Sequence, residues 1–274
     1  MPRYDKEGLT PVELRLLHFQ SNWHYNSYTA HYFWWKKRFL VQRIFSGFLH
    51  KCSKTSIRIL DLGCGDGYDL FLMAKEASYL RKPTAQDIRF FGIDIDSEKI
   101  DYIRKRIAYE GYSDIIEVCQ GDIQESLDKF LPAPFDFILC SEVIEHLPES
   151  GKAILNISKL LIPGGWAVIT TPNSSNIISK LAGWFRQRNR QCKVSNGHIS
   201  LRNYRDWVKL FHSAGFRIIN IRRGPLVYGY CWLDEKPIIA GLLITLDGLI
   251  DRFFPLPDLA CSTLFLLEKL PGGV

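Results

Sequence analysis

Two carboxylates and a histidine stand at helical spacing in the segment CSEVIEHL. Glu142 precedes Glu145 by three residues and His146 by four, so one helical turn would bring all three to one side. Such a set forms half of a coordination shell for a divalent cation (Mg, Mn or Zn). His198, in the later loop SNGHIS, is a fourth candidate ligand. The alternative is that Glu142 and His146 are polar groups of a neighbouring site and Glu145 is solvated.

A glycine-rich turn follows the apolar segment IRILDL. Its residues follow the pattern Asp61-x-Gly63-x-Gly65-x-Gly67. Glycines after a strand allow a sharp turn and a close approach of a ligand to the main chain. The dinucleotide fingerprint G-x-G-x-x-G would require its third glycine at Tyr68. The pattern therefore favours a nucleotide-like ligand and disfavours a nicotinamide dinucleotide.

Further candidate residues stand at the ends of other predicted strands. Asp94 and Ile95 close FFGIDI, Asp122 and Ile123 follow IIEVCQ, and Ser141 closes FDFILCS. Doubly wound folds bind ligands in the loops at the carboxyl ends of successive parallel strands. Each motif alone can be a structural turn, but their order along the chain predicts one common ligand site.

Strand and helix patterns alternate strictly around these motifs. Apolar runs rich in Ile, Val and Phe predict strands buried on both faces, at 57–62, 90–95, 115–120, 135–141 and 166–171. Helical patterns cover 68–79, 97–110, 125–130 and 149–161, with Ser97 as an N-cap candidate. The alternation predicts an α/β fold with a doubly wound, mostly parallel sheet.

The flanking segments complete this architecture. Helices at 176–188 and 202–214, a strand at 216–222, an apolar helix at 237–254 and a strand at 263–268 bring the predicted sheet to seven strands. Ten aromatic residues lie between Trp23 and Phe48, and residues 1–56 are expected to form an N-terminal helical cap. Residues 57–274 form the main domain, with a basic segment at 180–223 and an apolar insertion at about 224–260.

The net charge of +6 is concentrated in one segment. Between Lys180 and Arg223 there are eleven Lys or Arg and one acid, and the rest of the chain is net acidic. Such a segment could face phosphate, nucleic acid or anionic lipid, or be a solvated surface helix. The apolar stretch 238–250 is a core helix or, alternatively, a helix on a membrane surface.

The composition favours a compartment in which cysteine thiols stay reduced. The seven cysteines include no CxxC pair, the N-terminus MPRYDKEGLT has no apolar core of a signal peptide, and no uncharged apolar run approaches a membrane span. We expect a cytoplasmic protein that can also contact a membrane peripherally.

The ordered motifs resemble the class I S-adenosylmethionine-dependent methyltransferase family, over about 57–216. The resemblance implies that the Asp61-to-Gly67 turn surrounds the donor and that Asp94 binds the ribose hydroxyls. It also implies that Asp122 binds the adenine amino group with Ile123 against the ring. A carboxylate suits the ribose role because it can accept two hydrogen bonds from a cis-diol.

The ExxEH segment with a later histidine resembles two branches of that family. One comprises ubiquinone-biosynthesis O-methyltransferases, which act on catechol-like polyprenyl rings. The other comprises small-RNA 3′-terminal 2′-O-methyltransferases, in which such residues hold a divalent ion. The segment TPN before a predicted helix and the loop histidine is more similar to the first branch.

The leading hypothesis is O-methylation of a small acceptor that is lipid-linked or anionic. His146 or His198 would act as general base, or a bound cation would lower the pKa of the acceptor hydroxyl. One alternative is an RNA 2′-O-methyltransferase that uses the basic segment as its electrostatic footprint. Nucleic acid is the less favoured partner because no separate RNA-binding module is visible. Another alternative is a non-catalytic protein that binds the donor without turnover.

Overall fold

A seven-stranded sheet organises the computed structural model, which describes residues 28–80, 87–127, 131–132, 134–176, 198–225, 237–253, 257 and 260–272. The strands are β1 (Ser56–Leu62), β2 (Asp87–Asp94), β3 (Ile116–Gln120), β4 (Phe135–Ser141), β5 (Leu161–Pro172), β6 (Phe216–Arg223) and β7 (Ser262–Lys269). Their spatial order is β3-β2-β1-β4-β5-β7-β6. Strand β7 is antiparallel to both neighbours and the other pairs are parallel. The prediction of a mostly parallel seven-stranded sheet is confirmed.

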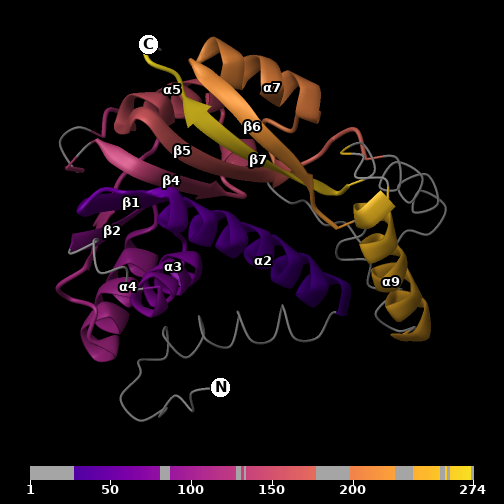
Figure 1. Ribbon diagram of the computed structural model, residues 1–274, viewed down its shortest axis with the longest axis horizontal. Coiled ribbons are helices and arrows are strands. Elements are labelled where there is room, and N and C mark those ends of the chain that lie inside the picture. The colour runs from indigo at the N-terminus through magenta and orange to yellow at the C-terminus, as the bar shows by residue number, and fades with distance from the viewer. Residues whose placement is uncertain are drawn as a thin grey trace.

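Helices cover both faces of this sheet (Figure 1). One face carries α2 (Tyr28–Lys51), α3 (Tyr68–Tyr79) and α4 (Ser97–Glu110), and the other carries α5 (Ser150–Leu160) and α7 (Tyr204–Ser213). A 3₁₀ turn, η1 (Ile144–His146), follows β4, and α9 (Pro237–Phe253) contacts α2 at the side of the molecule.

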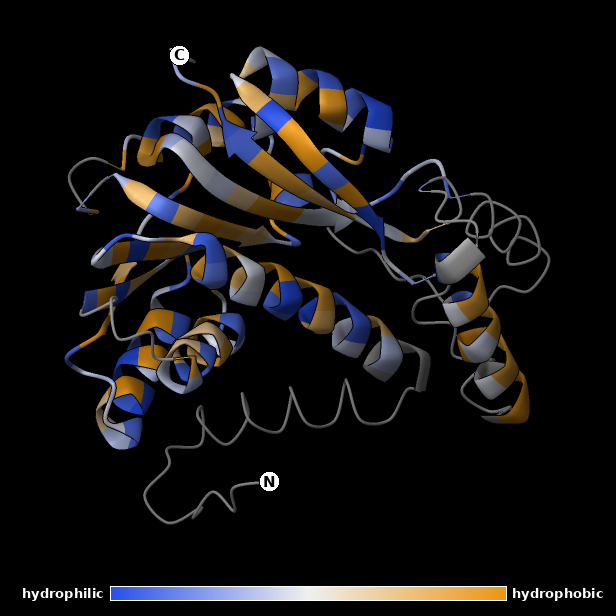
Figure 2. Cartoon of the chain, viewed as in Figure 1, coloured by the Kyte–Doolittle hydropathy of each residue, from blue (hydrophilic) through white to orange (hydrophobic). Residues whose placement is uncertain are grey.

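Alternate residues of each central strand enter different hydrophobic cores. In β1, Ile57 and Ile59 pack on the side of α2, α3 and α4, whereas Leu60 and Leu62 pack on the side of α5 and α7. A strand with apolar residues on both faces is typical of a parallel sheet covered by two helical layers. Figure 2 shows the resulting hydrophobic strands between helices that have one apolar side each.

The strand order reverses between β1 and β4. The chain proceeds from β1 outward to β2 and β3, then returns to β4 on the other side of β1. Loops that diverge at such a switch point open a crevice at the carboxyl ends of the strands. The predicted ligand motifs follow β1, β2, β3 and β4, so the fold brings them to this crevice.

Local structure differs from the sequence predictions at two helix starts. The N-cap of α4 is Asp96 and not Ser97, because the Asp96 carboxylate accepts hydrogen bonds from the backbone of Glu98 and Lys99. Residues 125–127 are not helical, and residues 128–130 of the helix predicted at 125–130 lie outside the described part. Here the Asn156 side chain donates to the carbonyls of residues 123 and 125 at 2.9 and 2.7 Å.

Some predicted features fall outside the described residues. These are the cap before residue 28, nearly all of the helix predicted at 176–188 and the basic segment up to residue 197. Within the described part, no helix combines the length and apolar character needed to cross a bilayer. The five described cysteines are free thiols.

Candidate functional site

The turn after β1 requires its glycines. Gly63, Gly65 and Gly67 all adopt positive φ angles, of 73°, 55° and 76°. A Cβ on Gly63 would also lie 2.5 Å from Val143 Cγ2, so this position excludes a side chain on two grounds. The Gly63 amide donates to the Ile93 carbonyl at 2.8 Å, which fixes the turn against the end of β2.

Asp94 joins this turn to the end of β2. Its Oδ2 accepts a hydrogen bond from the Gly65 amide at 2.8 Å, and its Oδ1 accepts one from the Asp96 amide at 3.0 Å. The carboxylate is therefore held in one orientation while retaining further lone pairs for a ligand.

Asp61 and Asp122 occupy different surroundings. Asp61 is 3 % exposed, and burial, followed by the charges of Asp69 and Asp94, raises its pKa well above the usual range. It therefore lies beneath the site. Asp122 lies beside the crevice, where its Oδ1 accepts from the Gln124 amide at 2.8 Å.

One cavity of about 700 Å³ connects the ends of β1 to β4. This volume lies within the range that accommodates a nucleotide-sized ligand. Nine of the predicted site residues line the cavity: Gly63, Gly65, Asp94, Ile95, Asp122, Ile123, Ser141, Glu142 and His146. The other four are Asp61, Gly67, Glu145 and His198, which lie beneath it or beside it.

Glu142 departs from the helical arrangement that its spacing predicts. It has a φ of 57° and is the one described non-glycine residue with positive φ. Its amide donates to the Thr170 carbonyl at 2.9 Å, which extends the pairing of β4 with β5, and the helical turn begins only at Ile144. Its Oε1 is buried and accepts no hydrogen bond. A strained backbone and an unsatisfied buried oxygen in one residue are typical of a functional position.

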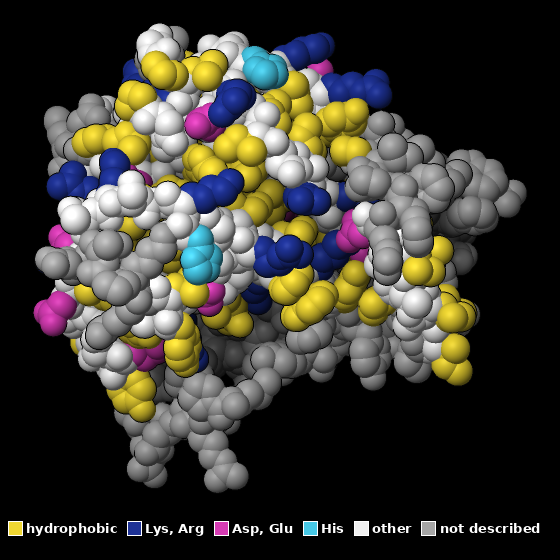
Figure 3. Space-filling view, viewed as in Figure 1, with side chains coloured by type: hydrophobic (Ala, Val, Ile, Leu, Met, Phe, Trp, Pro, Cys, Tyr) yellow, Lys and Arg dark blue, Asp and Glu magenta, His cyan; other side chains and the backbone are white. Residues whose placement is uncertain are grey.

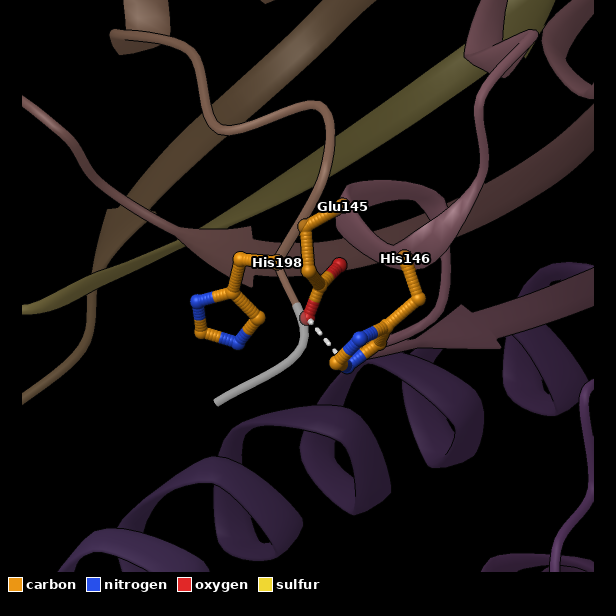
Figure 4. A group of neighbouring side chains, drawn as sticks. All are labelled: Glu145, His146 and His198. Atoms are coloured by element: carbon orange, nitrogen blue, oxygen red, sulfur yellow. Dashed lines mark ion pairs between the residues drawn. The ribbon is translucent and has the colours of Figure 1, made fainter. Parts of the chain in front are cut away.

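Three of the four predicted metal ligands meet beside the cavity. The ligand atoms of Glu145, His146 and His198 all lie within 4.8 Å of one another, and Figure 4 shows the Glu145 carboxylate between the two imidazole rings. His146 Nε2 lies 3.8 Å from Glu145 Oε1, and the two ring centroids are 4.9 Å apart. Glu142 is not part of this group.

Backbone contacts bring His198 to the other two residues across more than fifty positions. The amides of Ile199 and Ser200 both donate to the Glu145 carbonyl at 2.9 Å. The Ser200 hydroxyl also donates to the Leu147 carbonyl at 2.5 Å. The loop that carries His198 is therefore anchored on the turn after β4.

Burial affects Glu145 and His198 differently, and the protonation state of His198 suits metal or base chemistry. Burial, and then the Glu142 charge, raises the pKa of Glu145 well above its usual range, and neither of its oxygens accepts a hydrogen bond. Burial, and then His146, lowers the pKa of His198. A histidine with a lowered pKa is neutral near pH 7, the form that binds a metal or accepts a proton.

The inner side of α2 supplies a wall that the sequence motifs did not identify. Trp34, Lys37 and Arg38 line the cavity. Arg38 lies over the ring of Tyr68 at 3.6 Å and 3.6 Å from Asp69 Oδ1. The segment WWKKR is the available signal, since it places charges within an otherwise aromatic helix. The sequence indicates an aromatic cap but not which side faces the site.

Buried ion pairs fix α9 to the rest of the molecule. Lys36 lies 2.6 Å from Asp247 and 2.5 Å from Asp251, and Arg223 pairs with both acids at 2.6 Å. Tyr32 donates to Asp247 at 2.7 Å. Burial favours the neutral acid, but Lys36, Tyr32 and Arg223 outweigh it and lower the pKa of Asp247. Both acids of α9 therefore point inward.

The chain matches a family model described as a methyltransferase domain over residues 24–221. A ubiquinone biosynthesis O-methyltransferase of Paracidovorax citrulli is 28% identical over 116 residues, which are 42% of this chain and 44% of that protein. A probable S-adenosylmethionine-dependent methyltransferase of Mycolicibacterium smegmatis is 24% identical over 188 residues, 68% of this chain and 60% of that protein. The chain thus spans less than half the length of the ubiquinone-biosynthesis relative.

Solved structures share the fold at low sequence identity. The magnesium protoporphyrin IX methyltransferase of Synechocystis PCC 6803 with bound SAH has a TM-score of 0.60 and 11% identity, covering 92% of this chain and 94% of that chain. A [4+2]-cyclase has a TM-score of 0.54 and 17% identity, covering 84% and 81%. The presence of a cyclase among them shows that the fold alone does not determine the reaction.

Proposed function

The chain belongs to the methyltransferase domain family, as predicted, and from this we propose that it is an enzyme that transfers a methyl group from S-adenosylmethionine to an oxygen atom of a small acceptor. The observation that carries the proposal is the cavity in which the donor motifs after β1, β2 and β3 meet Glu142 and His146 after β4. A donor in the first part of this cavity would present its methyl group to an acceptor in the second. The ubiquinone-biosynthesis relatives support oxygen as the methylated atom.

The reaction needs positioning and one proton acceptor. The acceptor oxygen forms a bond to the methyl carbon as the carbon–sulfur bond breaks, the hydroxyl proton leaves, and S-adenosylhomocysteine is the product. Holding the two reactants in line supplies much of the rate. His198, with its lowered pKa, and His146 are the candidate bases beside this position.

Binding and turnover test this proposal together. In calorimetry we expect S-adenosylmethionine and S-adenosylhomocysteine to bind and NAD not to bind. With methyl-labelled donor, turnover on lipid extract or fractionated small metabolites is the expected result. Turnover on RNA alone would favour a 2′-O-methyltransferase, and donor binding without turnover would favour a non-catalytic protein. NAD binding without donor binding would contradict the proposal.

We propose further that Glu145, His146 and His198 hold one divalent cation. Their ligand atoms are already close together, and the buried Glu145 oxygens, which accept no hydrogen bond, fit a role as metal ligands. Two imidazoles and one carboxylate suit zinc or a similar ion better than magnesium. Such an ion would lower the pKa of an acceptor hydroxyl. We assign Glu142 to the cavity rather than to this cation.

Metal titration tests the cation directly. We expect Zn²⁺ or Mn²⁺ to bind the chelator-treated protein in calorimetry, and we expect His198→Ala to weaken that binding at least tenfold, the usual scale for losing one ligand or its support. His50→Ala, at the far end of α2, is the matched control. Equal binding by both variants, together with turnover that resists chelator, would remove the metal and leave the histidines as candidate bases.

We propose that the acceptor is an amphiphile taken from an anionic lipid surface. The outward side of α9 exposes large apolar side chains, of which Ile238 is 80 % and Leu242 66 % exposed, and Figure 3 shows this hydrophobic surface at the side of the molecule. Because Asp247 and Asp251 point inward, no described side chain on this outward side is charged. Apolar side chains combined with the basic segment 180–223 suit an anionic membrane surface.

Vesicle sedimentation tests this source of the acceptor. We expect partial binding to anionic vesicles that weakens at high salt, since exposed charges are screened over about 8 Å at physiological ionic strength. Binding to neutral vesicles should be weaker. A protein that remains in solution with both vesicle types would contradict the membrane proposal and favour a water-soluble acceptor.

A further inference from the structure

Lys37 places a buried cation against the donor cavity. The residue is 3 % exposed and lines the cavity. Its ammonium lies 3.6 Å from the centroid of the Trp34 ring, and it makes no ion pair or hydrogen bond with the described residues. Burying an ammonium is strongly unfavourable when no anion compensates it, and one aromatic ring offsets only part of this penalty.

The neighbouring lysine on the same helix shows what a satisfied buried ammonium looks like. Lys36 lies within 2.6 Å of two carboxylates, on Asp247 and Asp251. Lys37 has no such partner, although its burial is similar. Burial lowers the pKa of Lys37, and the more distant charges of Glu142 and Asp69 only partly oppose this effect.

Glu142 lines the same cavity and has the complementary deficit. The buried Oε1 of Glu142 accepts no hydrogen bond, and Glu142 faces the cavity from the end of β4. The cavity therefore contains an ammonium on α2 that has no ion-pair partner among the described residues and, just after β4, a carboxylate with one unsatisfied oxygen. Lys37 and Glu142 attract each other without forming an ion pair. A bound molecule could satisfy both, with an anionic oxygen against Lys37 and a separate N–H or O–H group that donates to Glu142.

We propose that Lys37 is the anion-binding residue of this site and that its ammonium binds a carboxylate of a bound small molecule. Two sources can supply that carboxylate: the α-carboxylate of the S-adenosylmethionine donor, or an acidic group on the acceptor. The inference rests on the proposed function for the identity of these two molecules. In both cases Trp34 supports the ammonium from the other side and α2 acts as part of the site as well as a cover for the sheet.

Lys37→Met, which keeps the aliphatic volume and removes the charge, tests the proposal, and Lys37→Arg restores a cation. Lys51→Met is the control, because Lys51 is an exposed lysine at the end of the same helix. The first pair of probes is S-adenosylhomocysteine and the same compound without its α-carboxylate. The second pair is 3,4-dihydroxybenzoate and catechol, each titrated in the presence of saturating S-adenosylhomocysteine.

We expect the wild-type protein to prefer the acidic member of one pair by about ten- to a hundredfold, the scale of a hydrogen bond to a charged group. Lys37→Met should abolish that preference, Lys37→Arg should retain part of it, and Lys51→Met should leave it unchanged. Loss in the first pair identifies the donor as the source, and loss in the second identifies the acceptor.

Two results would overturn the proposal. One is a wild-type protein that shows no preference for the acidic member in either pair. The other is a Lys37→Met variant that binds all four probes as the wild type does while thermal unfolding shows it to be folded. A wild-type protein that binds neither form of the donor product would instead contradict the proposed function.

Discussion

The donor side and the acceptor side of the cavity are built in different ways. On the donor side, each loop continues directly from its own strand, and its polar groups pair with nearby backbone, as Asp94 does with Gly65. On the acceptor side, Glu142 comes from the end of β4 and His198 from a loop before α7, and buried oxygens of Glu142 and Glu145 there lack partners. The strand-end loops of the donor side are thus satisfied within the protein, whereas the acceptor side has buried polar groups that a ligand would satisfy.

The largest expected effect comes from the ion pairs that hold α9 and α2 together. Asp247→Asn leaves the buried cations Lys36 and Arg223 with Asp251 as their one shared carboxylate, and it should lower the free energy of unfolding by about 3–5 kcal/mol. Urea unfolding measures this change. Asp101→Asn, which removes an exposed pair with Arg104, should change it by less than about 1 kcal/mol.

The Asp247→Asn variant also shows whether donor binding depends on the ion pairs that hold α9. The molecules that remain folded should bind S-adenosylhomocysteine as the wild type does, because none of the described residues of α9 lines the cavity. A stability loss no greater than that of Asp101→Asn would show that α9 is held by other contacts.

The ion pairs of Asp247 also predict that the free energy of unfolding depends on pH. The pKa of Asp247 is lower in the folded protein than its usual value of about 3.9, so its stabilising contribution is present above that pH and is lost as the pH falls through the folded pKa. The stability difference between wild type and Asp247→Asn should therefore shrink below about pH 4. The facing groups are Lys36, Arg223, Tyr32 and Asp251.

Local signals explain why the fold and the donor side could be predicted. The apolar runs identified all seven strands, and the bounds of α3 and α4 agree with the helical patterns. The turn glycines directly follow β1 and Asp94 closes β2, so their places at strand ends are visible in the sequence, although the hydrogen bonds that join the turn to β2 are long-range.

Glu142 and Lys37 were less accessible from sequence because long-range contacts determine their surroundings. Glu142 takes a positive φ where its amide pairs with Thr170 on β5, and no local pattern encodes that pairing. Lys36 and Lys37 are adjacent and chemically identical, yet one meets two carboxylates of α9 and the other faces the cavity. The position of α9, which supplies both carboxylates to Lys36, accounts for the difference in their surroundings.

The next prediction concerns Gly63, the glycine of the donor turn that tolerates a side chain least. Gly63→Ala combines a positive φ, which costs about 1–2 kcal/mol, with a close contact to Val143. We expect a total loss of stability of about 2–4 kcal/mol and at least tenfold weaker binding of S-adenosylhomocysteine. Gly111→Ala is the control, because it has the same sign of φ but nothing within 4 Å. Equal losses in both variants would show that close packing at Gly63 contributes nothing.

A smaller effect is expected from Asp94. Asp94→Ala removes the acceptor for the Gly65 amide and the proposed partner of the ribose hydroxyls, and it should weaken donor binding by about 1–3 kcal/mol. Calorimetry with S-adenosylhomocysteine measures this loss. Asp101→Ala, on the exposed side of α4, should have no effect. Unchanged affinity in Asp94→Ala would place the donor elsewhere in the cavity.

The smallest effect, and the most specific to the acceptor side, is expected at the outward face of α9. Leu242 is 66 % exposed, so Leu242→Ser should leave the free energy of unfolding nearly unchanged in solution. If this face enters a lipid surface, the same substitution removes apolar area from the bound state and should weaken binding to anionic vesicles by about 1 kcal/mol, roughly fivefold. Leu155→Ser, an exposed leucine on α5, should not change vesicle binding. If both serine variants sediment with vesicles as the wild type does, α9 is not the contact, and the basic segment alone would have to account for any binding to lipid. A selective loss in Leu242→Ser would instead show that the acceptor side extends beyond the cavity to the surface from which we propose its substrate comes.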